Sequence, residues 1–247
     1  MGKLSGKIAV VTGSSSGIGR EIALGFAQEG ATVIVTSCSS VSAGEEVVSK
    51  IQTLGGHAKY YQADLCNRAE VTNFFNKIRT DFEHIDILIN NAGRTFAFDF
   101  QNITEETIAK DLQINYLSAV YCSQEAVKLM RSGHIINTAS IRGIGSASRK
   151  GLIGYGGAKA ALIHFTQVLA NELAPNIFVN AVAPGLIMTD ALSKTDSELV
   201  QKWERNIPIG RFIKPEELVE VYLLLATSTI FTGSVLIPDG GYTLVEK

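Results

Sequence analysis

Short runs rich in Val and Ile, each followed by a longer stretch with helical spacing, recur along the whole chain and constrain its fold more than any other feature. The apolar runs are residues 7–12, 32–36, 58–63, 86–91, 134–139, 177–182 and 234–238, and the candidate helices are 18–29, 42–54, 67–82, 104–130, 156–174, 196–205 and 215–226. Strands that alternate with helices are typical of βαβ units. Because the runs are continuously apolar, they predict strands covered on both faces. The sequence therefore predicts a doubly wound α/β fold with a single seven-stranded, mostly parallel sheet and helices on both faces.

Composition and charge narrow the class of protein. The chain has 247 residues, of which 46% are hydrophobic and 19% charged, so it can bury a sizeable core. No linker, low-complexity tract or internal repeat interrupts it, which predicts one domain over residues 1–247. Twenty-two basic and twenty-four acidic residues give a net charge of −2, and nothing in this balance favours nucleic acid or an anionic membrane.

The cysteines and the length of the apolar runs indicate the cellular compartment that we expect for this protein. Three cysteines without C-x-x-C spacing indicate neither a disulfide framework nor a zinc site, and the four histidines do not stand at metal-ligand spacing. No uncharged run reaches the length of a membrane helix, and the first residues lack a leader's apolar region. We therefore expect a soluble, cytoplasmic protein without a metal, a membrane or a nucleic-acid partner.

The glycine-rich stretch VVTGSSSGIGRE, residues 10–21, joins the first predicted strand to the first helix. A helix N-terminus carries unpaired N–H groups and a partial positive charge, and Gly13, Gly17 and Gly19 let a phosphate approach the backbone closely. The three serines at 14–16 add hydroxyl donors. This context predicts a pyrophosphate site at the carboxyl edge of the sheet, with a tight turn that binds no ligand as the alternative.

Polar residues also end other predicted strands. Asp64 follows the third strand, where its carboxylate can accept a hydrogen bond from an adenine amino group or, alternatively, cap a helix. NNAG, residues 90–93, ends the fourth strand with two amides and a glycine, which can line a crevice or simply form a turn. Ser140 follows the fifth strand. The carboxyl ends of parallel strands meet at one edge of a sheet, so we expect these groups to lie near the glycine-rich turn.

Tyr155 and Lys159 are four residues apart and share one face of a predicted helix. An ammonium beside a phenol favours the phenolate, which predicts that the pKa of Tyr155 falls from about 10 toward neutrality. Such a tyrosine can act as a general acid–base, and the Ser140 hydroxyl can polarise the same carbonyl. A Tyr-x-x-x-Lys pair also arises by chance in chains of this composition. No Ser-His-Asp arrangement competes, because no histidine stands near a nucleophile elbow.

The motifs T-G-x-x-x-G-x-G, N-N-A-G, the strand-ending serine and Y-x-x-x-K, in this order, resemble those of the short-chain dehydrogenase/reductase family, whose members have a Rossmann fold. The resemblance covers almost the whole chain and extends to NAVAPG at 180–185 and to a G-R-x-x-x-P-E-E run. It implies that Tyr155 is the general acid–base, that Lys159 lowers its pKa and holds the nicotinamide ribose, that Ser140 orients the carbonyl and that Asn115 supports a water-linked proton relay.

The motifs and the family resemblance imply cofactor contacts at the ends of five strands and at Tyr155 and Lys159 on the helix. These contacts are Gly13, Ser15, Ser16, Gly17, Ile18, Gly19, Ser37, Asp64, Leu65, Asn91, Ala92, Gly93, Tyr155, Lys159, Pro184, Gly185, Ile187 and Thr189. A ribose 2′-hydroxyl is usually held by an acid at the end of the second strand, and Ser37 stands there instead. The absence of a repelling carboxylate favours NADP over NAD, with Arg20 as the nearest basic side chain.

Two regions are expected to select the substrate. The segment 186–208 should cover the active site as a lid, with an amphipathic surface helix as the alternative. The interval from Ser140 to Tyr155 is two residues longer than is usual in the family and contains SRKG, residues 148–151, which should alter the substrate loop more than the chemistry.

The resemblance implies a reductase, with NADP favoured as its cofactor, that transfers a hydride to a 3-oxoacyl thioester or similar β-keto compound. The pattern is closest to bacterial 3-oxoacyl-(acyl-carrier-protein) reductases. Sugar and cyclic-alcohol dehydrogenases of the family share it, and a non-catalytic NAD(P)-sensing module is a third hypothesis. Family members commonly pair the helices near 104–130 and 156–174 across subunits, which predicts a homotetramer.

Overall fold

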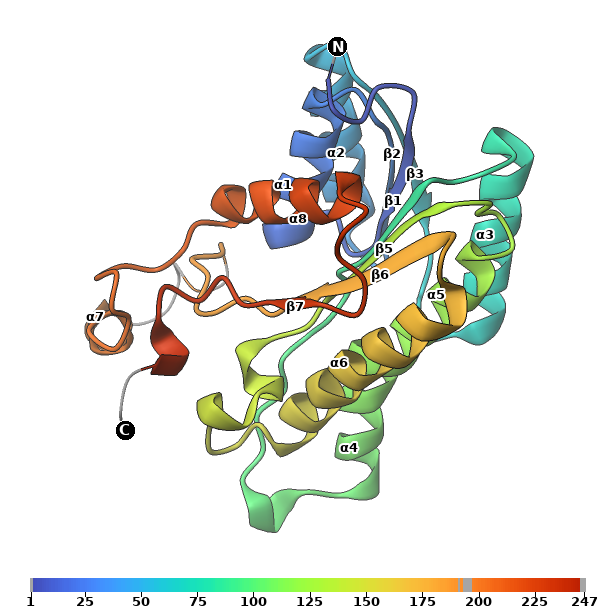
Figure 1. The fold of residues 1–247 in the computed structure, drawn as a ribbon. Helices are drawn as coiled ribbons and strands as arrows, with labels where there is room; N and C mark the ends of the chain where they lie inside the picture. Colours follow the sequence, from blue (N-terminus) through green and yellow to red (C-terminus); the bar gives the residue numbers. More distant parts are fainter. Residues whose placement is uncertain (1, 191, 193–196, 245–247) are drawn as a thin grey trace.

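A seven-stranded parallel sheet forms the centre of the protein, as a computed structural model shows (Figure 1). The structure describes residues 2–190, 192 and 197–244. The strands are β1 (Ile8–Val11), β2 (Thr32–Ser37), β3 (His57–Gln62), β4 (Ile87–Asn90), β5 (Gly133–Thr138), β6 (Ile177–Val182) and β7 (Val235–Leu236). Their order across the sheet is β3-β2-β1-β4-β5-β6-β7, and every neighbouring pair is parallel. The predicted fold class is therefore confirmed.

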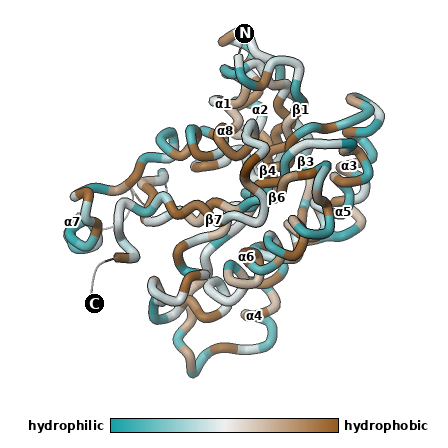
Figure 2. Tube along the Cα trace, in the orientation of Figure 1, coloured by the Kyte–Doolittle hydropathy of each residue, from teal (hydrophilic) through white to brown (hydrophobic). Residues whose placement is uncertain are grey.

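Helices cover both faces of the sheet (Figure 1). One layer contains α1 (Gly17–Gln28), α2 (Val41–Thr53) and α8 (Val219–Thr227), and the other contains α3 (Arg68–Phe82), α5 (Ser118–Ala126) and α6 (Ile153–Leu173). Successive residues of β1 pack on opposite sides, because Ala9 and Val11 belong to the first core and Val10 to the second. The continuous apolar strands of Figure 2 follow from this double cover.

The long helix predicted over 104–130 is interrupted in the structure. It consists of α4 (Glu105–Leu112), one π-helical turn (Gln113–Leu117) and α5. The side chain of Asn115, in the π-helical turn, bonds to both backbone groups of Arg94, accepting from its N–H at 3.0 Å and donating to its carbonyl at 2.8 Å. The π-helical turn thus anchors the loop that follows β4. Single π-helical turns inside α-helices frequently occur at functional sites.

Two further elements differ from their predicted bounds. The predicted helix over 215–226 begins as a 3-10 turn (Pro215–Leu218) before α8, and β7 contains only two residues. In the predicted lid, α7 (Ser197–Glu204) is helical, whereas residues 191 and 193–196 of that segment lie outside the described residues.

A buried network of polar side chains ties β4 and β5 to the helices behind them. Asn90 Nδ2 donates to Ser123 Oγ at 3.0 Å and to Asn137 Oδ1 at 2.9 Å, and Asn137 Nδ2 donates to Thr166 Oγ1 at 2.9 Å. All four side chains are buried. Hydrogen bonds are strong where water is excluded, so this network fixes the strand ends from which the site is built.

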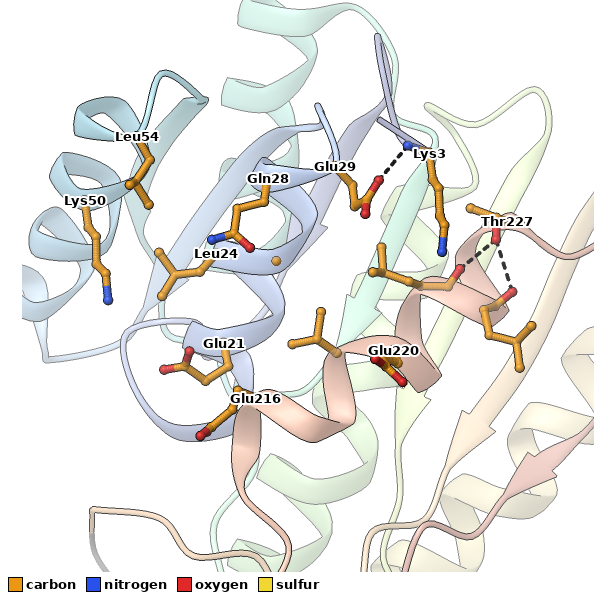
Figure 3. Close-up of a pocket in the computed structure, with 14 residues that line it drawn as sticks. Lys3, Glu21, Leu24, Gln28, Glu29, Lys50, Leu54, Glu216, Glu220 and Thr227 are labelled. Atoms are coloured by element: carbon orange, nitrogen blue, oxygen red, sulfur yellow. Dashed lines mark hydrogen bonds between the residues drawn. The ribbon is translucent and has the colours of Figure 1, made fainter. Parts of the chain in front are cut away.

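A surface groove of about 790 Å³ lies between α1, α2 and α8 (Figure 3). Charged side chains, among them Glu21, Glu216, Glu220, Lys3 and Lys50, line it together with leucines. None of the predicted catalytic or cofactor residues belongs to its walls. None of the helices formed by the described residues has both the length and the apolar content that a membrane span requires.

Candidate active site

The glycine-rich turn forms a cradle whose shape depends on missing side chains. Gly13 and Gly17 have φ values of 62° and 54°, in the left-handed region that side chains disfavour. A Cβ on Gly13 would lie 2.9 Å from Ala92 Cα, and one on Gly19 would run into the Asn91 amide. Helix α1 begins at Gly17, so the cradle opens onto its free N–H groups. This is the arrangement that a pyrophosphate requires.

Asn91 and Thr12 join this cradle to the end of β4. Asn91 Nδ2 donates to the carbonyls of Thr12 at 3.0 Å and Gly13 at 3.2 Å, while Thr12 Oγ1 accepts from the N–H groups of Asn91 and Ala92 at 2.9 and 3.0 Å. Thr12 is buried and was missed as a site residue, although it opens the T-G-x-x-x-G-x-G motif. The two strand ends are therefore held as one unit.

Ser14 does not serve as the hydroxyl donor that the sequence suggested. Its side chain is fully buried, donates to the Val11 carbonyl at 2.6 Å and accepts from the Thr36 N–H at 3.1 Å. It therefore braces β1 against β2. Ser15 is partly buried and Ser16 is exposed, so these two remain available to a ligand.

The segment after β6 faces the cradle. The Thr189 methyl lies 3.7 Å from where a Cβ on Gly17 would be, which places two predicted cofactor segments opposite one another. Ile187 pairs with Ile213 in a parallel bridge, and the N–H of Gly185 donates to the Pro238 carbonyl at 3.1 Å. Arg20 contacts Asp190 at 3.3 Å and so links α1 to this segment.

At the adenosine end, the predicted residues lie beside one another at the ends of β2 and β3. The Ser37 hydroxyl donates to the Ser40 carbonyl at 3.0 Å and lies 2.9 Å from the Tyr60 hydroxyl. Asp64 is partly buried and accepts from the Cys66 N–H at 2.9 Å. The Leu65 side chain packs in the core, so only its backbone can face a ligand.

Arg20, the basic side chain nearest the glycines in sequence, is already paired with acids. Its guanidinium contacts Glu21 at 2.9 Å as well as Asp190, and these carboxylates raise its pKa further. The glycine cradle, the helix N-terminus and the polar strand ends together fit a dinucleotide. A nicotinamide dinucleotide, when bound, supplies or accepts a hydride.

Tyr155 and Ser140 meet where α6 begins and β5 has ended. Tyr155 lies in the first turn of α6, and Ser140 begins a 3-10 turn whose Arg142 N–H donates to the serine Oγ at 3.1 Å. Burial raises the pKa of Tyr155, and the hydrogen-bonding side chains of Ser140 and Thr95 and the charge of Arg142 oppose that rise. Thr95 was not foreseen as a neighbour of the phenol. The direction is the reverse of the predicted one, because burial outweighs the groups that favour the phenolate.

Lys159 is fully enclosed one turn further along α6. It is 3% exposed, its Nζ donates to the Thr138 carbonyl at 2.7 Å, and it lies 5.8 Å from the centre of the Tyr155 ring. Burial lowers the pKa of Lys159 to about 8. The ammonium is thus close to the phenol but is itself destabilised by its surroundings.

Asn115 and Lys159 both approach Gly93. A Cβ on Gly93 would lie 2.8 Å from Asn115 Oδ1 and 3.4 Å from Lys159 Nζ, so a glycine is needed where these two side chains converge. The structure therefore brings together the four predicted catalytic residues, three of them on or beside α6 and the fourth in the π-helical turn. Because the Asn115 amide is engaged with Arg94, its immediate effect is to position the loop that follows β4.

The longer interval between Ser140 and Tyr155 contacts the predicted lid. It contains two 3-10 turns, and its Gly151 carbonyl accepts from the Phe98 N–H at 2.9 Å. The Arg149 guanidinium lies 4.8 Å from the centre of the Trp203 ring on α7. Such a cation–π contact is worth roughly 0.5–1 kcal/mol at an exposed site. Arg149, in the segment 148–151, therefore lies against α7 of the predicted lid.

Comparison with known proteins assigns the family. A family model described as Enoyl-(Acyl carrier protein) reductase matches residues 13–243. The chain is 38% identical to 3-oxoacyl-(acyl-carrier-protein) reductase FabG of Aquifex aeolicus, over 97% of this chain and 98% of the relative. It is 35% identical to 2-dehydro-3-deoxy-D-gluconate 5-dehydrogenase of Pseudoalteromonas atlantica, over 97% and 96%. The chain belongs to the short-chain dehydrogenase/reductase family of oxidoreductases.

Solved structures agree over nearly the full length. A short-chain dehydrogenase/reductase from Mycobacterium marinum superposes with a TM-score of 0.92 at 34% identity, covering 98% of this chain and 97% of that one. A 7α-hydroxysteroid dehydrogenase complexed with NADH has a TM-score of 0.91 at 32% identity, over 96% and 94%. The RhlG/NADP complex of Pseudomonas aeruginosa has a TM-score of 0.91 at 30% identity, over 97% of both chains.

Proposed function

We propose that this chain is an NADP-dependent reductase of 3-oxoacyl thioesters or similar β-keto compounds. The observation that carries the proposal is the convergence of Ser140, a protonated Tyr155 and the buried Lys159 beside a glycine cradle for a dinucleotide. FabG of Aquifex aeolicus supports the substrate class. The NADH and NADP complexes of the structural neighbours support a nicotinamide cofactor.

The proposed chemistry follows from the protonation states. The Ser140 hydroxyl binds the substrate carbonyl oxygen, and Tyr155 donates its phenolic proton to that oxygen as the carbonyl carbon is reduced. Because burial raises the pKa of Tyr155, the phenol is protonated at neutral pH, which is the state that reduction needs. Lys159 orients the ribose, and we assign Asn115 to a water-linked proton relay.

The direct test is a substrate panel with both cofactors. We expect acetoacetyl-coenzyme A to be reduced with NADPH at a kcat/KM at least tenfold above that for oxidation of gluconate or cyclohexanol with NAD or NADP. The family relationship to a 2-dehydro-3-deoxy-D-gluconate 5-dehydrogenase makes sugar acids the second candidate class. Faster turnover of a sugar acid would replace the first proposal with the second.

The proposed preference for NADP rests on Ser37. A carboxylate at the end of β2 would repel a 2′-phosphate and hold a 2′-hydroxyl instead. We expect Ser37→Asp to shift the ratio of kcat/KM for NADPH and NADH by about 10²-fold toward NADH, since the new charge is placed beside the phosphate.

Ser37→Asn is the matched control for this change. It has nearly the same size as aspartate and loses the same contact with Tyr60, but it adds no charge. Steady-state kinetics with both cofactors measure the effect. If the unaltered protein already prefers NADH, the NADP assignment is wrong.

We also propose that the protein is a cytoplasmic homotetramer. Large apolar side chains are exposed on two separate surfaces. Ile153 and Val168 lie on α6, Leu224 lies on α8, and Ile237 directly follows β7. Exposed apolar patches of this kind often mark subunit interfaces. We expect sedimentation at micromolar concentration to give four times the 26.5 kDa chain mass. A monomer under those conditions would contradict the assignment.

A further inference from the structure

Arg142 is placed between the two groups that handle the substrate oxygen. It is partly buried in the 3-10 turn that follows Ser140, and its own N–H donates to the serine Oγ at 3.1 Å. Its carbonyl lies 2.9 Å from where a Cβ on Gly156 would be, directly after Tyr155. The backbone of Arg142 is therefore fixed against the first turn of α6, and its side chain leaves the backbone next to Ser140.

The guanidinium of Arg142 has neutral partners. It donates to the Ala147 carbonyl at 2.8 Å and to the Tyr242 hydroxyl at 3.5 Å, and it lies 5.2 Å from the centre of the Tyr242 ring. Among the residues that the structure describes, no carboxylate lies within ion-pair distance of it. A guanidinium has five N–H donors in a planar fork that matches a carboxylate or phosphate, so two neutral contacts leave donors for an oxyanion.

The chain segment that carries Arg142 has no acid of its own. Residues 126–171 contain six Lys or Arg and no Asp or Glu. The buried acid of the neighbouring α4, Asp111, packs against Gly154, and burial raises its pKa, which favours its neutral form. A partly buried guanidinium whose hydrogen-bond partners are neutral gains a charge-assisted pair when an anion binds.

We propose that Arg142 binds an oxyanion of the substrate, so that the enzyme selects keto compounds that carry a negative charge. The anion is either the carboxylate of a free keto acid or a phosphate on the arm that carries a thioester. The inference rests on the proposed function, because it uses the site centred on Tyr155. It adds that charge recognition, separate from the carbonyl chemistry, determines which β-keto compound binds.

Matched substrates and variants test this assignment. The carboxylate pair is acetoacetate and its neutral ethyl ester, and the phosphate pair is acetoacetyl-coenzyme A and the phosphate-free N-acetylcysteamine thioester. Arg142→Gln removes the charge but keeps the backbone N–H that contacts Ser140. Arg142→Lys keeps the charge without the fork. Arg79→Gln removes the same charge from an exposed position on α3.

We expect Arg142→Gln to lower kcat/KM about 10- to 100-fold for the charged member of one pair, mainly through KM, and less than threefold for its neutral partner. The kcat/KM of Arg142→Lys for the charged compound should lie between those of the unaltered protein and Arg142→Gln. Arg79→Gln should change kcat/KM for neither member of a pair. The pair that responds identifies the source of the anion. An equal loss on both members, or no loss on either charged compound, overturns the inference.

Binding without turnover separates this inference from the proposed function. If neither neutral keto compound is reduced with NADPH or NADH, the proposed function fails. Calorimetric titration of acetoacetate and of inorganic phosphate into the protein with NADP then still tests Arg142. We expect Arg142→Gln to weaken the binding of acetoacetate or of phosphate at least tenfold, and Arg79→Gln to leave both affinities unchanged. Equal affinities for the unaltered protein and Arg142→Gln overturn the inference.

Discussion

Replacement of Tyr155 by phenylalanine is expected to lower kcat for carbonyl reduction by about 10³-fold, within the ~10²–10⁴ range typical of a lost general acid. The ring keeps its place at the start of α6, and only the hydroxyl that interacts with Ser140 and Thr95 disappears. Binding of the cofactor should change little, because the glycine cradle and Lys159 remain. Single-turnover rates and a cofactor titration measure the two quantities separately.

Tyr121→Phe is the matched control, since it removes the same atom from α5, where Tyr121 stacks against Arg68. Its kcat should equal that of the unaltered protein. A Tyr155→Phe variant with full activity would remove the assigned mechanism and leave the NAD(P)-sensing module as the better hypothesis.

The same tyrosine sets the pH dependence. Because burial raises the pKa of Tyr155, the proton donor is present throughout the neutral range, and reduction is lost only as pH rises through that pKa. Oxidation of the alcohol needs the phenolate and should increase over the same pH interval. Tyr155→Phe should flatten both profiles, which a structural role for the hydroxyl would not do.

The strand pattern was sufficient to predict the sheet, because the central strands β1, β2, β4, β5 and β6 are largely buried and read as apolar runs. The edge strand β3 alternates between exposed and more buried residues, so the prediction of cover on both faces was wrong for that strand. The edge where Gly13, Asn91 and Ser140 meet followed from parallel topology, whereas the order of the strands is known only from the structure. The π-helical turn could not be predicted, since the contact that its Asn115 makes is with Arg94, 21 residues earlier in the chain.

The site was predicted less completely than the fold for the same reason. Residue identity does not reveal that the Ser14 hydroxyl is used between β1 and β2, or that burial dominates the pKa of Tyr155. The contact between Arg142 and Tyr242 joins residues 100 positions apart. Such facts depend on tertiary packing, which a motif does not encode.

Lys159→Met is expected to stabilise the fold while it lowers activity strongly. The ordinary pKa of this ammonium is 10.5, and burial lowers it to about 8. At about 1.36 kcal/mol per pKa unit, keeping the group charged at pH 7 costs about 3 kcal/mol. Loss of the 2.7 Å bond to the Thr138 carbonyl offsets about 1 kcal/mol of the gain. The free energy of unfolding should therefore rise by about 2 kcal/mol at pH 7, and kcat should fall by about 10²-fold or more.

The pH dependence identifies the cause of this stabilisation. Between about pH 8 and 10.5 the unfolded chain binds the Lys159 proton more readily than the folded protein does, so the stability of the unaltered protein rises with pH through that window. The methionine variant lacks this term, and its advantage should shrink by about 3 kcal/mol from pH 7 to pH 10.5. Urea unfolding at a fixed protein concentration measures the free energy of unfolding of both proteins at each pH.

Lys77→Met, at an exposed position of α3, is the control and should change the unfolding free energy by less than about 0.5 kcal/mol at either pH. A Lys159→Met protein that is less stable than its parent at pH 7 would show that the ammonium is favourably bound where it lies. If the prediction holds, the catalytic lysine is kept at the expense of stability. The fold then keeps at Lys159 a destabilised cation, which the ribose of the proposed cofactor and a phenolate formed at Tyr155 would stabilise.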